Sequence, residues 1–205
     1  MQIISFSFLN GERTNQWKCF GVFLSISVPL IIATAMLPAL NPLFFILNLL
    51  IGVLGWTYLE YHLHRFWTHK KNGATKEGSL GRHIHHHTHP AEIKVTALQR
   101  GVLIIITILF LVASVTLNNY FTVMAGFTGG FSYSFFSHWL LHQKWSAKIC
   151  PNLHRFHIWH HCKQPDKCFG FSTILWDLIF GTHAPKDAVI SKKVMQFYYG
   201  EHSHQ

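Results

Sequence analysis

The chain has 205 residues, enough for one domain, and its 49% apolar content with only 12% charged residues is unusual for a soluble protein. Its formal net charge of +9 comes without a nucleic-acid-binding motif, so we expect anionic lipid headgroups and no nucleic acid as partners of this charge. The four cysteines show no CxxC spacing, which excludes a zinc ribbon and a disulfide scaffold and favours reduced, structural thiols.

Four apolar segments are long enough to cross a bilayer as helices, which requires about 20 residues each. They lie at about residues 19–37, 41–59, 101–117 and 120–141. The third contains the run GVLIIITILFLVASVTL, which carries no charge and is rare in the core of a soluble protein. The sequence therefore predicts an all-α integral membrane protein in which four transmembrane helices form two hairpins.

The turns that close these hairpins contain no Lys or Arg, so all 17 basic residues fall on the opposite side of the membrane. The positive-inside rule makes that side cytoplasmic. We therefore expect one domain over residues 1–205, with a cytoplasmic helical cap built from residues 60–100 and 142–183. The polar tail after residue 183 is expected to be peripheral. The C-terminus shows no retrieval signal for the endoplasmic reticulum, which favours a bacterial inner membrane.

The predicted fourth span is less apolar than the others, because AGFTGGFSYSFFS places small and hydroxyl residues where lipid-facing Leu or Ile is expected. Small residues let helices approach closely, so this composition indicates tight helix packing. A substrate groove along the same face is the alternative interpretation.

Histidines recur at helical spacings on the predicted cytoplasmic side. EYHLHRFWTH and SHWLLH each supply a pair, and RHIHHH and HIWHH each contain an HxxHH pattern. Positions i, i+3 and i+4 share one face of a helix, so each HxxHH triplet is expected to aim three imidazoles at a common volume. The candidate metal ligands are His64, His69, His83, His86, His87, His138, His142, His157, His160 and His161.

Ten imidazoles exceed the roughly four to six ligands that one transition metal holds, so the sequence predicts a dinuclear site. His64 and His69 lie about 140° apart around an ideal helix, so they either serve different metals or straddle a frayed helix end. One histidine alone is more often a satisfied interfacial residue, and the joint pattern carries the prediction. The histidines expected to lie outside the ligand set are His62, His85, His89, His154, His183, His202 and His204.

Carboxylates are scarce, with eight in the chain, so the carboxylate-rich templates of two-metal hydrolases and soluble di-iron oxygenases do not fit. Glu60, one helical turn before His64, and Asp177 are candidates to orient a ligand imidazole through its other nitrogen. The alternatives are an interfacial charge for Glu60 and a surface or helix-start charge for Asp177. Imidazole suits several transition metals, so the ligand type does not name the metal.

The motifs HRFWTH, HxxHH followed by Pro90, HxxxH, and HIWHH followed by FGFSTILWDLIFGT resemble those of the fatty acid hydroxylase superfamily, also called the sterol desaturase family. The resemblance runs from about Glu60 to Thr182 and is strongest to the fatty acid 2-hydroxylase branch without its cytochrome b5 domain. It implies a non-haem di-iron oxygenase in which the ten candidate histidines hold two iron ions, with zinc able to occupy the site in purified protein. The implied reaction uses O₂ to hydroxylate an unactivated C–H bond of a membrane lipid, such as the acyl chain of a fatty acid or sphingolipid.

One departure bears on the substrate: Pro90 is followed by Ala91 and Glu92, where the 2-hydroxylases usually carry Asp two residues after the proline. A carotenoid hydroxylase, whose sequences HQKW also resembles, and a sterol or lipid desaturase therefore stay as alternatives. A membrane metal transporter or sensor is the non-enzyme alternative. Transport sites lie near the bilayer midplane, however, and the predicted spans contain no histidine before their cytoplasmic ends.

The sequence contains no haem motif, flavin fingerprint or iron–sulfur cysteine run, so an oxygenase of this kind needs a separate electron donor. A basic cytoplasmic surface could steer an acidic cytochrome b5 or ferredoxin, while positive-inside topology alone is the simpler explanation of its charge. The lysines in question are Lys70, Lys71, Lys76, Lys144, Lys148, Lys163 and Lys167.

Overall fold

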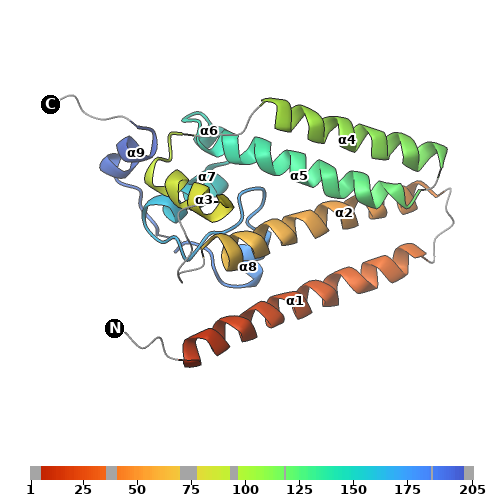
Figure 1. The fold of residues 1–205 in the computed structure, drawn as a ribbon, viewed down its shortest axis with the longest axis horizontal. Coiled ribbons are helices and arrows are strands. Elements are labelled where there is room, and N and C mark those ends of the chain that lie inside the picture. Colours follow the sequence, from red (N-terminus) through yellow and green to blue (C-terminus); the bar gives the residue numbers. More distant parts are fainter. Residues whose placement is uncertain are drawn as a thin grey trace.

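The computed structural model describes residues 6–35, 41–69, 78–92, 97–117, 119–185 and 187–200. The regular structure in these ranges is helical, with four long helices running along one another and the short helices gathered at one end (Figure 1). The predicted all-α class is therefore confirmed. The long helices are α1 (Phe6–Ala35), α2 (Pro42–Leu63), α4 (Ala97–Thr116) and α5 (Phe121–Leu141).

Each long helix contains one of the four predicted apolar segments, but the helix ends differ from the predicted ones. The largest difference is at α1, which starts at Phe6 rather than near Cys19. Hydropathy marks the apolar part of a helix and not its end, and in α1 a polar stretch, NGERTNQ, precedes the apolar segment that begins near Cys19. At α2, by contrast, Asn41 caps the helix because its side-chain oxygen accepts from the Leu43 amide at 2.9 Å, and Pro42 occupies the first turn.

Helices α2 and α5 pack closely through glycines. A Cβ atom on Gly52 would lie 2.1 Å from the Val123 carbonyl oxygen, and one on Gly126 would lie 2.1 Å from the Leu49 carbonyl oxygen. No side chain fits at either position, so the small residues of α5 serve close helix approach as predicted.

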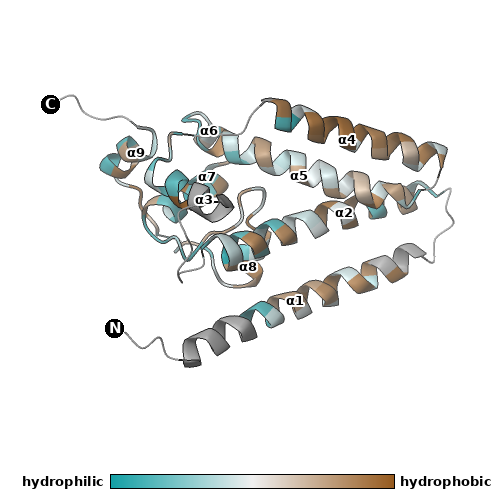
Figure 2. Cartoon of the chain, viewed as in Figure 1, coloured by the Kyte–Doolittle hydropathy of each residue, from teal (hydrophilic) through white to brown (hydrophobic). Residues whose placement is uncertain are grey.

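Among the described residues, two helices are long and apolar enough to cross a membrane: α2 with its extension, Pro42–Thr68, and α4 over Leu98–Thr116. Only 6% of the apolar window of α4 is buried within the protein. Figure 2 colours α4 as hydrophobic over most of its length after a hydrophilic segment near its start, whereas the short helices are more hydrophilic. A helix this apolar and this exposed indicates a membrane protein.

The short helices form a cap at one end of the long ones (Figure 1). The last of them corrects a prediction, because the tail after residue 183 is not peripheral: α9 packs on α7, and Tyr198 in α9 is fully buried. His202 and His204 lie outside the described residues. The cap elements are η1 (His64–Thr68), α3 (Gly78–Thr88), α6 (Ser146–Ile149), α7 (Pro151–Cys162), α8 (Leu175–Ile179) and α9 (Lys192–Tyr198).

Candidate metal centre

All ten candidate histidines lie in the cap or at the adjoining ends of α2 and α5, where they form two groups of five. Within each group, one nitrogen from every ring lies within 4.8 Å of the others, so each group could hold a metal ion. Cluster A consists of His64, His69, His83, His87 and His160, and cluster B consists of His86, His138, His142, His157 and His161.

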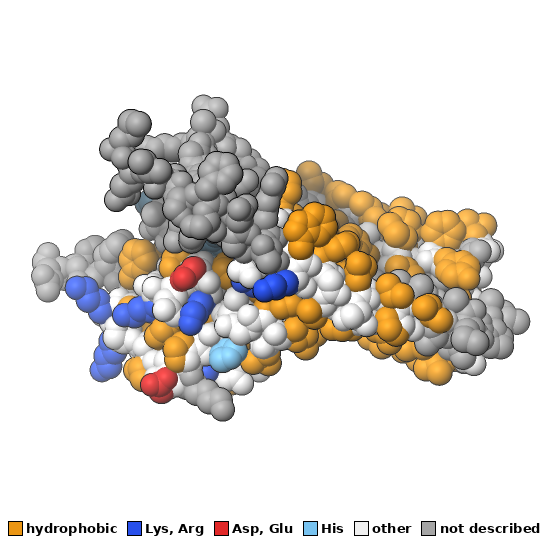
Figure 3. Space-filling view, turned by 90° about the horizontal axis from the view of Figure 1, so that it is seen from below, with side chains coloured by type: hydrophobic (Ala, Val, Ile, Leu, Met, Phe, Trp, Pro, Cys, Tyr) orange, Lys and Arg blue, Asp and Glu red, His pale blue; other side chains and the backbone are white. Residues whose placement is uncertain are grey.

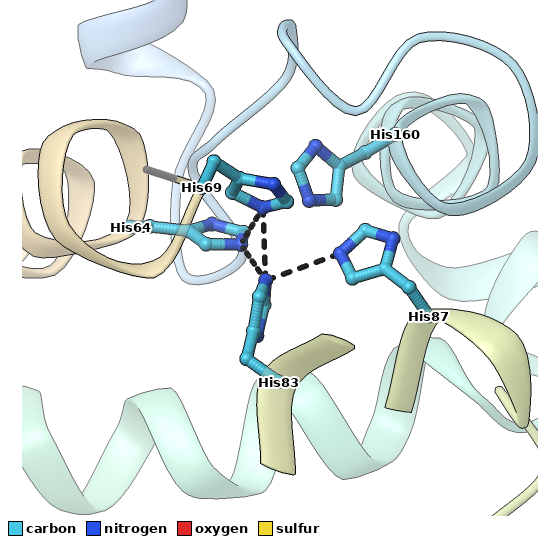
Figure 4. A group of neighbouring side chains, drawn as sticks. All are labelled: His64, His69, His83, His87 and His160. Atoms are coloured by element: carbon cyan, nitrogen blue, oxygen red, sulfur yellow. Dashed lines mark hydrogen bonds between the residues drawn. The ribbon is translucent and has the colours of Figure 1, made fainter. Parts of the chain in front are cut away.

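The rings of cluster A point their Nε2 atoms at one another (Figure 4). His83 Nε2 lies 2.8 Å from His69 Nε2 and 3.1 Å from the Nε2 atoms of both His64 and His87. His64 Nε2 and His69 Nε2 are 3.2 Å apart. Three of these nitrogens thus form a nearly equilateral triangle around one small volume.

Cluster B repeats this arrangement with rings from three helices. His86 Nε2 lies 3.0 Å from His138 Nε2, and His157 Nε2 lies 3.1 Å from His142 Nε2. The His161 ring closes the group, with its centroid 4.6 Å from the centroids of both His86 and His157.

These distances fit bound metal ions. With metal–nitrogen bonds of about 2.0–2.1 Å, two ligands at a right angle have nitrogens about 3 Å apart. Protonation states point the same way: His64 Nδ1 donates to the Phe169 carbonyl oxygen at 2.5 Å, which leaves Nε2 of the neutral ring as a lone pair facing two other imidazole nitrogens. His160 Nδ1 likewise donates to the Lys167 carbonyl oxygen at 2.6 Å, and its buried Nε2 has no hydrogen-bond partner within the part of the chain that the structure describes.

The sequence predicted that the three imidazoles of each HxxHH triplet point into a common volume. This is wrong, because each triplet is divided between clusters A and B. On α3, His83 and His87 belong to cluster A while His86 belongs to cluster B. The pattern is reversed on α7, where His160 belongs to cluster A while His157 and His161 belong to cluster B. Positions i+3 and i+4 lie about 100° apart around a helix, so a helix that runs between two volumes sends them to different sides.

His64 and His69 meet in the same cluster because the chain between them is a π-helical turn, η1. A π turn repeats near every fifth residue, which brings positions i and i+5 onto one face, whereas an α-helix separates them. The pair therefore lies in one cluster, and the chain between the two residues is a π turn rather than a frayed helix end.

The ten clustered imidazoles favour the neutral form, which is the form that binds metal. Burial is the main cause, and the charge of neighbouring rings adds to it. Together they lower the pKa of His69 and His87 to about 3, and burial lowers the pKa of His86 to about 4. The pKa values of His157 and His161 in cluster B are lowered well below the usual value for the same reasons.

Glu60 and Asp177 act on the backbone and not on ligand imidazoles, which corrects their predicted role. Asp177 accepts from the amides of Phe169 and Gly170 at 2.9 and 2.8 Å and from the Thr182 hydroxyl at 2.7 Å. Both carboxylates therefore hold the loop of residues 168–173, and this loop in turn carries the carbonyl that orients His64. The remaining contacts are from Glu60 to the Phe171 amide, the Ser172 amide and the Ser134 hydroxyl.

The other described histidines lie outside both clusters, as predicted. His85 is exposed, pairs with Glu92 at 3.3 Å and stacks on His89. His154 bonds through Nε2 to the Tyr199 hydroxyl at 2.6 Å. His62 contacts the Gln16 side chain, and His183 contacts the Ala184 carbonyl.

Three aromatic residues around the clusters escaped the sequence analysis. The Phe169 ring packs on His64, His69 and His160 of cluster A, with centroids 5.8 to 5.9 Å apart. The other two are Phe171, whose ring contacts both clusters, and Tyr198, which stacks on a ring of cluster B. Histidine spacing could not find them, although Phe169 and Phe171 belong to the quoted FGFSTILWDLIFGT motif.

The fatty acid hydroxylase family model matches residues 49–182, which include all ten clustered histidines. The chain belongs to the fatty acid hydroxylase family. A solved structure of full-length Scs7p, in which only the hydroxylase domain is visible, shares the fold with a TM-score of 0.50 and 24% identity, covering 86% of this chain and 69% of that one.

Relatives of this fatty acid hydroxylase family member include lipid hydroxylases. The chain is 30% identical over 138 residues to dihydroceramide fatty acyl 2-hydroxylase FAH1 of Arabidopsis thaliana, covering 64% of this chain and 58% of that protein. It is 30% identical over 162 residues to ceramide very long chain fatty acid hydroxylase SCS7 of Saccharomyces cerevisiae, covering 75% and 42%. The match to fatty acid 2-hydroxylase of Mus musculus is 27% over 147 residues and covers 67% and 40%.

Proposed function

We propose that the protein is a membrane di-iron oxygenase that hydroxylates an unactivated C–H bond in the acyl chain of a lipid. The observation that carries this proposal is the pair of five-imidazole clusters, each built from rings of three chain segments and sharing α3 and α7. Two iron ions held by clusters A and B would supply the activation of O₂ that such a hydroxylation requires.

The residues of the chain would hold, orient and shield this centre. The ten neutral imidazoles are the ligands, and the carbonyls of Phe169 and Lys167 fix the ring orientation of His64 and His160. Five of the ten rings are buried and the other five are partly buried, so the rings themselves limit the access of water to the centre.

We propose that α1, α2, α4 and α5 all span the membrane and that the cap faces the cytoplasm, in a multi-pass protein of a bacterial inner membrane. One observation supports the orientation and a second supports insertion into the membrane. Figure 3 shows hydrophobic side chains over the long helices and Lys and Arg side chains gathered toward the cap end. The large hydrophobic side chains of α4 are exposed, such as Ile105 at 59% and Leu109 at 62%, as expected for a helix in lipid.

A groove beside α2 supports an acyl chain as the substrate. Its volume is about 370 Å³, and Leu47, Leu50, Leu54 and Thr57 line it along α2. From Leu47 to Thr57 the helix rises about 15 Å, which suits an extended chain. At its end near the cap the groove reaches Ser172, which follows Phe171 in the chain. The Phe171 ring contacts both clusters. We propose that it receives the tail of the lipid while the reacting carbon lies at the clusters.

The deciding experiment is comparative lipid mass spectrometry of cells with and without the protein, with a competent electron donor present. We expect acyl chains that gain the mass of one oxygen atom. Loss of two hydrogen atoms instead would mean desaturation, and modified isoprenoid chains would mean a carotenoid hydroxylase. An unchanged lipidome would overturn the proposal. His86→Ala should abolish the product, whereas His85→Ala, a change at an exposed neighbouring ring, should preserve it.

The groove is tested by filling it. Leu50→Trp should lower hydroxylation of the longest acyl chains most and leave shorter chains nearly unaffected, because the indole blocks the part of the groove farther from the clusters. Leu109→Trp, at an exposed position of α4, is the matched control. An equal loss for all chain lengths in Leu50→Trp would show that the tail lies elsewhere while leaving the oxygenase assignment intact.

The electron donor is proposed to be a separate acidic protein such as cytochrome b5 or a ferredoxin. Among the described lysines, Lys144, Lys148 and Lys163 are exposed on the cap, and Lys167 is partly exposed there. Lys70, Lys71 and Lys76 lie outside the described residues. Exchange of Lys144 and Lys148 for Glu should slow reduction by such a donor, and the effect should disappear at high ionic strength.

A further inference from the structure

We infer that Tyr198, near the C-terminus, is a positioning residue for the metal site of cluster B. The inference rests on the dinuclear centre proposed above and is independent of the substrate. Tyr198 lies outside the histidine motifs and beyond the end of the family match at residue 182.

The Tyr198 ring covers cluster B directly. It stacks on the His142 ring, with centroids 4.8 Å apart and planes inclined by 14°, and its edge meets His161 at 5.6 Å. The hydroxyl donates to the Leu141 carbonyl oxygen at 3.2 Å, and the side chain is 0% exposed. A fully buried ring with its hydroxyl anchored in this way has one orientation, and it imposes that orientation on the imidazole beneath it.

Cluster B needs such a wall because two of its rings lack the carbonyl hydrogen bonds that orient His64 and His160 in cluster A. The Nδ1 atoms of His157 and His161 are buried and have no hydrogen-bond partner among the described residues. A metal-bound imidazole is usually oriented by a bond from its second nitrogen to a carbonyl, a carboxylate or water. Where that bond is missing, packing against neighbouring rings is what fixes the ligand.

Helix α9 is attached to the same helix that carries two ligands of cluster B. The Tyr199 hydroxyl bonds to His154 Nε2 at 2.6 Å, one turn before His157 on α7, and the Lys144 ammonium lies 5.7 Å from the centre of the Tyr199 ring. Ser191 caps α9 by accepting from the Val194 amide. Tyr198 is therefore held in place from both sides, by its own hydroxyl and by its neighbour.

The first test measures metal retention and needs no enzyme activity. Protein loaded with metal is challenged with a chelator, and the release of each metal equivalent is followed. Tyr198→Ala should release one of the two equivalents about 10- to 100-fold faster, the range expected when support of a ligand is lost. Tyr198→Phe should behave nearly as the wild type, because the ring remains. Phe197→Ala, at a half-exposed position of the same helix, is the matched control and should release both equivalents normally.

A double-mutant cycle separates positioning from a general loss of structure. In a His83→Ala background the remaining metal is in cluster B, and adding Tyr198→Ala should speed its release. In a His138→Ala background the remaining metal is in cluster A, and the same addition should change its release by less than about twofold. Equal acceleration in both backgrounds, or unchanged release in both, would overturn the inference. Since neither measurement involves a lipid, failure of the hydroxylase proposal would leave this result interpretable.

Discussion

Clusters A and B contain five imidazoles each, yet they are held in different ways. In cluster A, His64 and His160 donate to the backbone carbonyls of Phe169 and Lys167, so hydrogen bonds orient the rings. In cluster B, three of the five rings are buried, and the second nitrogens of His157 and His161 have no partner within the described ranges. Two rings of cluster A are therefore fixed by hydrogen bonds to carbonyls, and two rings of cluster B by packing.

The difference follows from where each cluster sits. Cluster A lies against the loop of residues 168–173, whose amides are bound by Glu60 and Asp177 and whose Phe169 carbonyl accepts from His64. Cluster B lies between α3, α5 and α7. On α7, His157 and His161 have aromatic rings as neighbours where His64 and His160 have carbonyls.

The largest effect, on metal content and on product formation, should come from replacing histidines of the α7 HxxHH motif one at a time. His160→Ala removes a ligand of cluster A and His157→Ala removes one of cluster B, so each variant should lose one metal and all product. Combining His160→Ala with His83→Ala should still lose only one metal, whereas combining it with His157→Ala should lose both. Metal content per chain, measured after anaerobic purification, checks this. Loss of both metals in the His160→Ala, His83→Ala protein would contradict the division into two clusters.

Acid should destabilise the metal-free protein through both clusters. The folded-state pKa values of His69, His86 and His87 lie at about 3 to 4, below the ordinary value of 6.5, so only the unfolded chain takes up protons as the pH falls below 6.5. Stability is therefore present above pH 6.5 and lost as the pH falls, by up to about 2 kcal/mol per ring at pH 5. Thermal unfolding of chelator-treated protein at pH 7.5 and 5 measures this. A midpoint that stays constant or rises on acidification would show that the rings are not held neutral.

A smaller and selective effect is expected from Asp177→Asn. The amide group of Asn presents a donor to backbone N–H groups that need an acceptor, so the loop that carries the Phe169 carbonyl should loosen. His64 is the ligand oriented by that carbonyl, so cluster A should release its metal about tenfold faster to a chelator while cluster B is spared. The cluster-specific backgrounds His138→Ala and His83→Ala distinguish the two. Faster release from cluster B alone would reverse the proposed connection.

Much of this arrangement follows from the sequence because its signals are local. The apolar runs predict the four long helices, and the helical spacing of histidines selects all ten residues of the two clusters. The division of each HxxHH triplet between two volumes could not be predicted in this way. It depends on where α3 and α7 lie relative to each other, which the periodicity of a single helix does not contain.

The π turn at His64 and the burial of Tyr198 escaped prediction for related reasons. Spacing rules assume an α-helix, and η1 departs from one where His64 and His69 must meet. Tyr198 lies in a tail of polar composition, and a single aromatic residue there gives no periodic signal. Its role becomes visible only when the tail folds back onto α7, which is a long-range contact.

Phe171 provides the mildest test, because it is the one described ring that belongs to neither cluster and touches both. Its centroid lies 5.5 Å from that of His64 in cluster A and 5.0 Å from that of His138 in cluster B, and Glu60 holds its amide at 3.0 Å. Phe171→Leu removes part of this shared wall but no ligand and no hydrogen bond. Release of both metals should therefore accelerate by the same factor, less than about tenfold. Acceleration at one cluster only would show that the ring supports that cluster alone and does not couple the two metal sites.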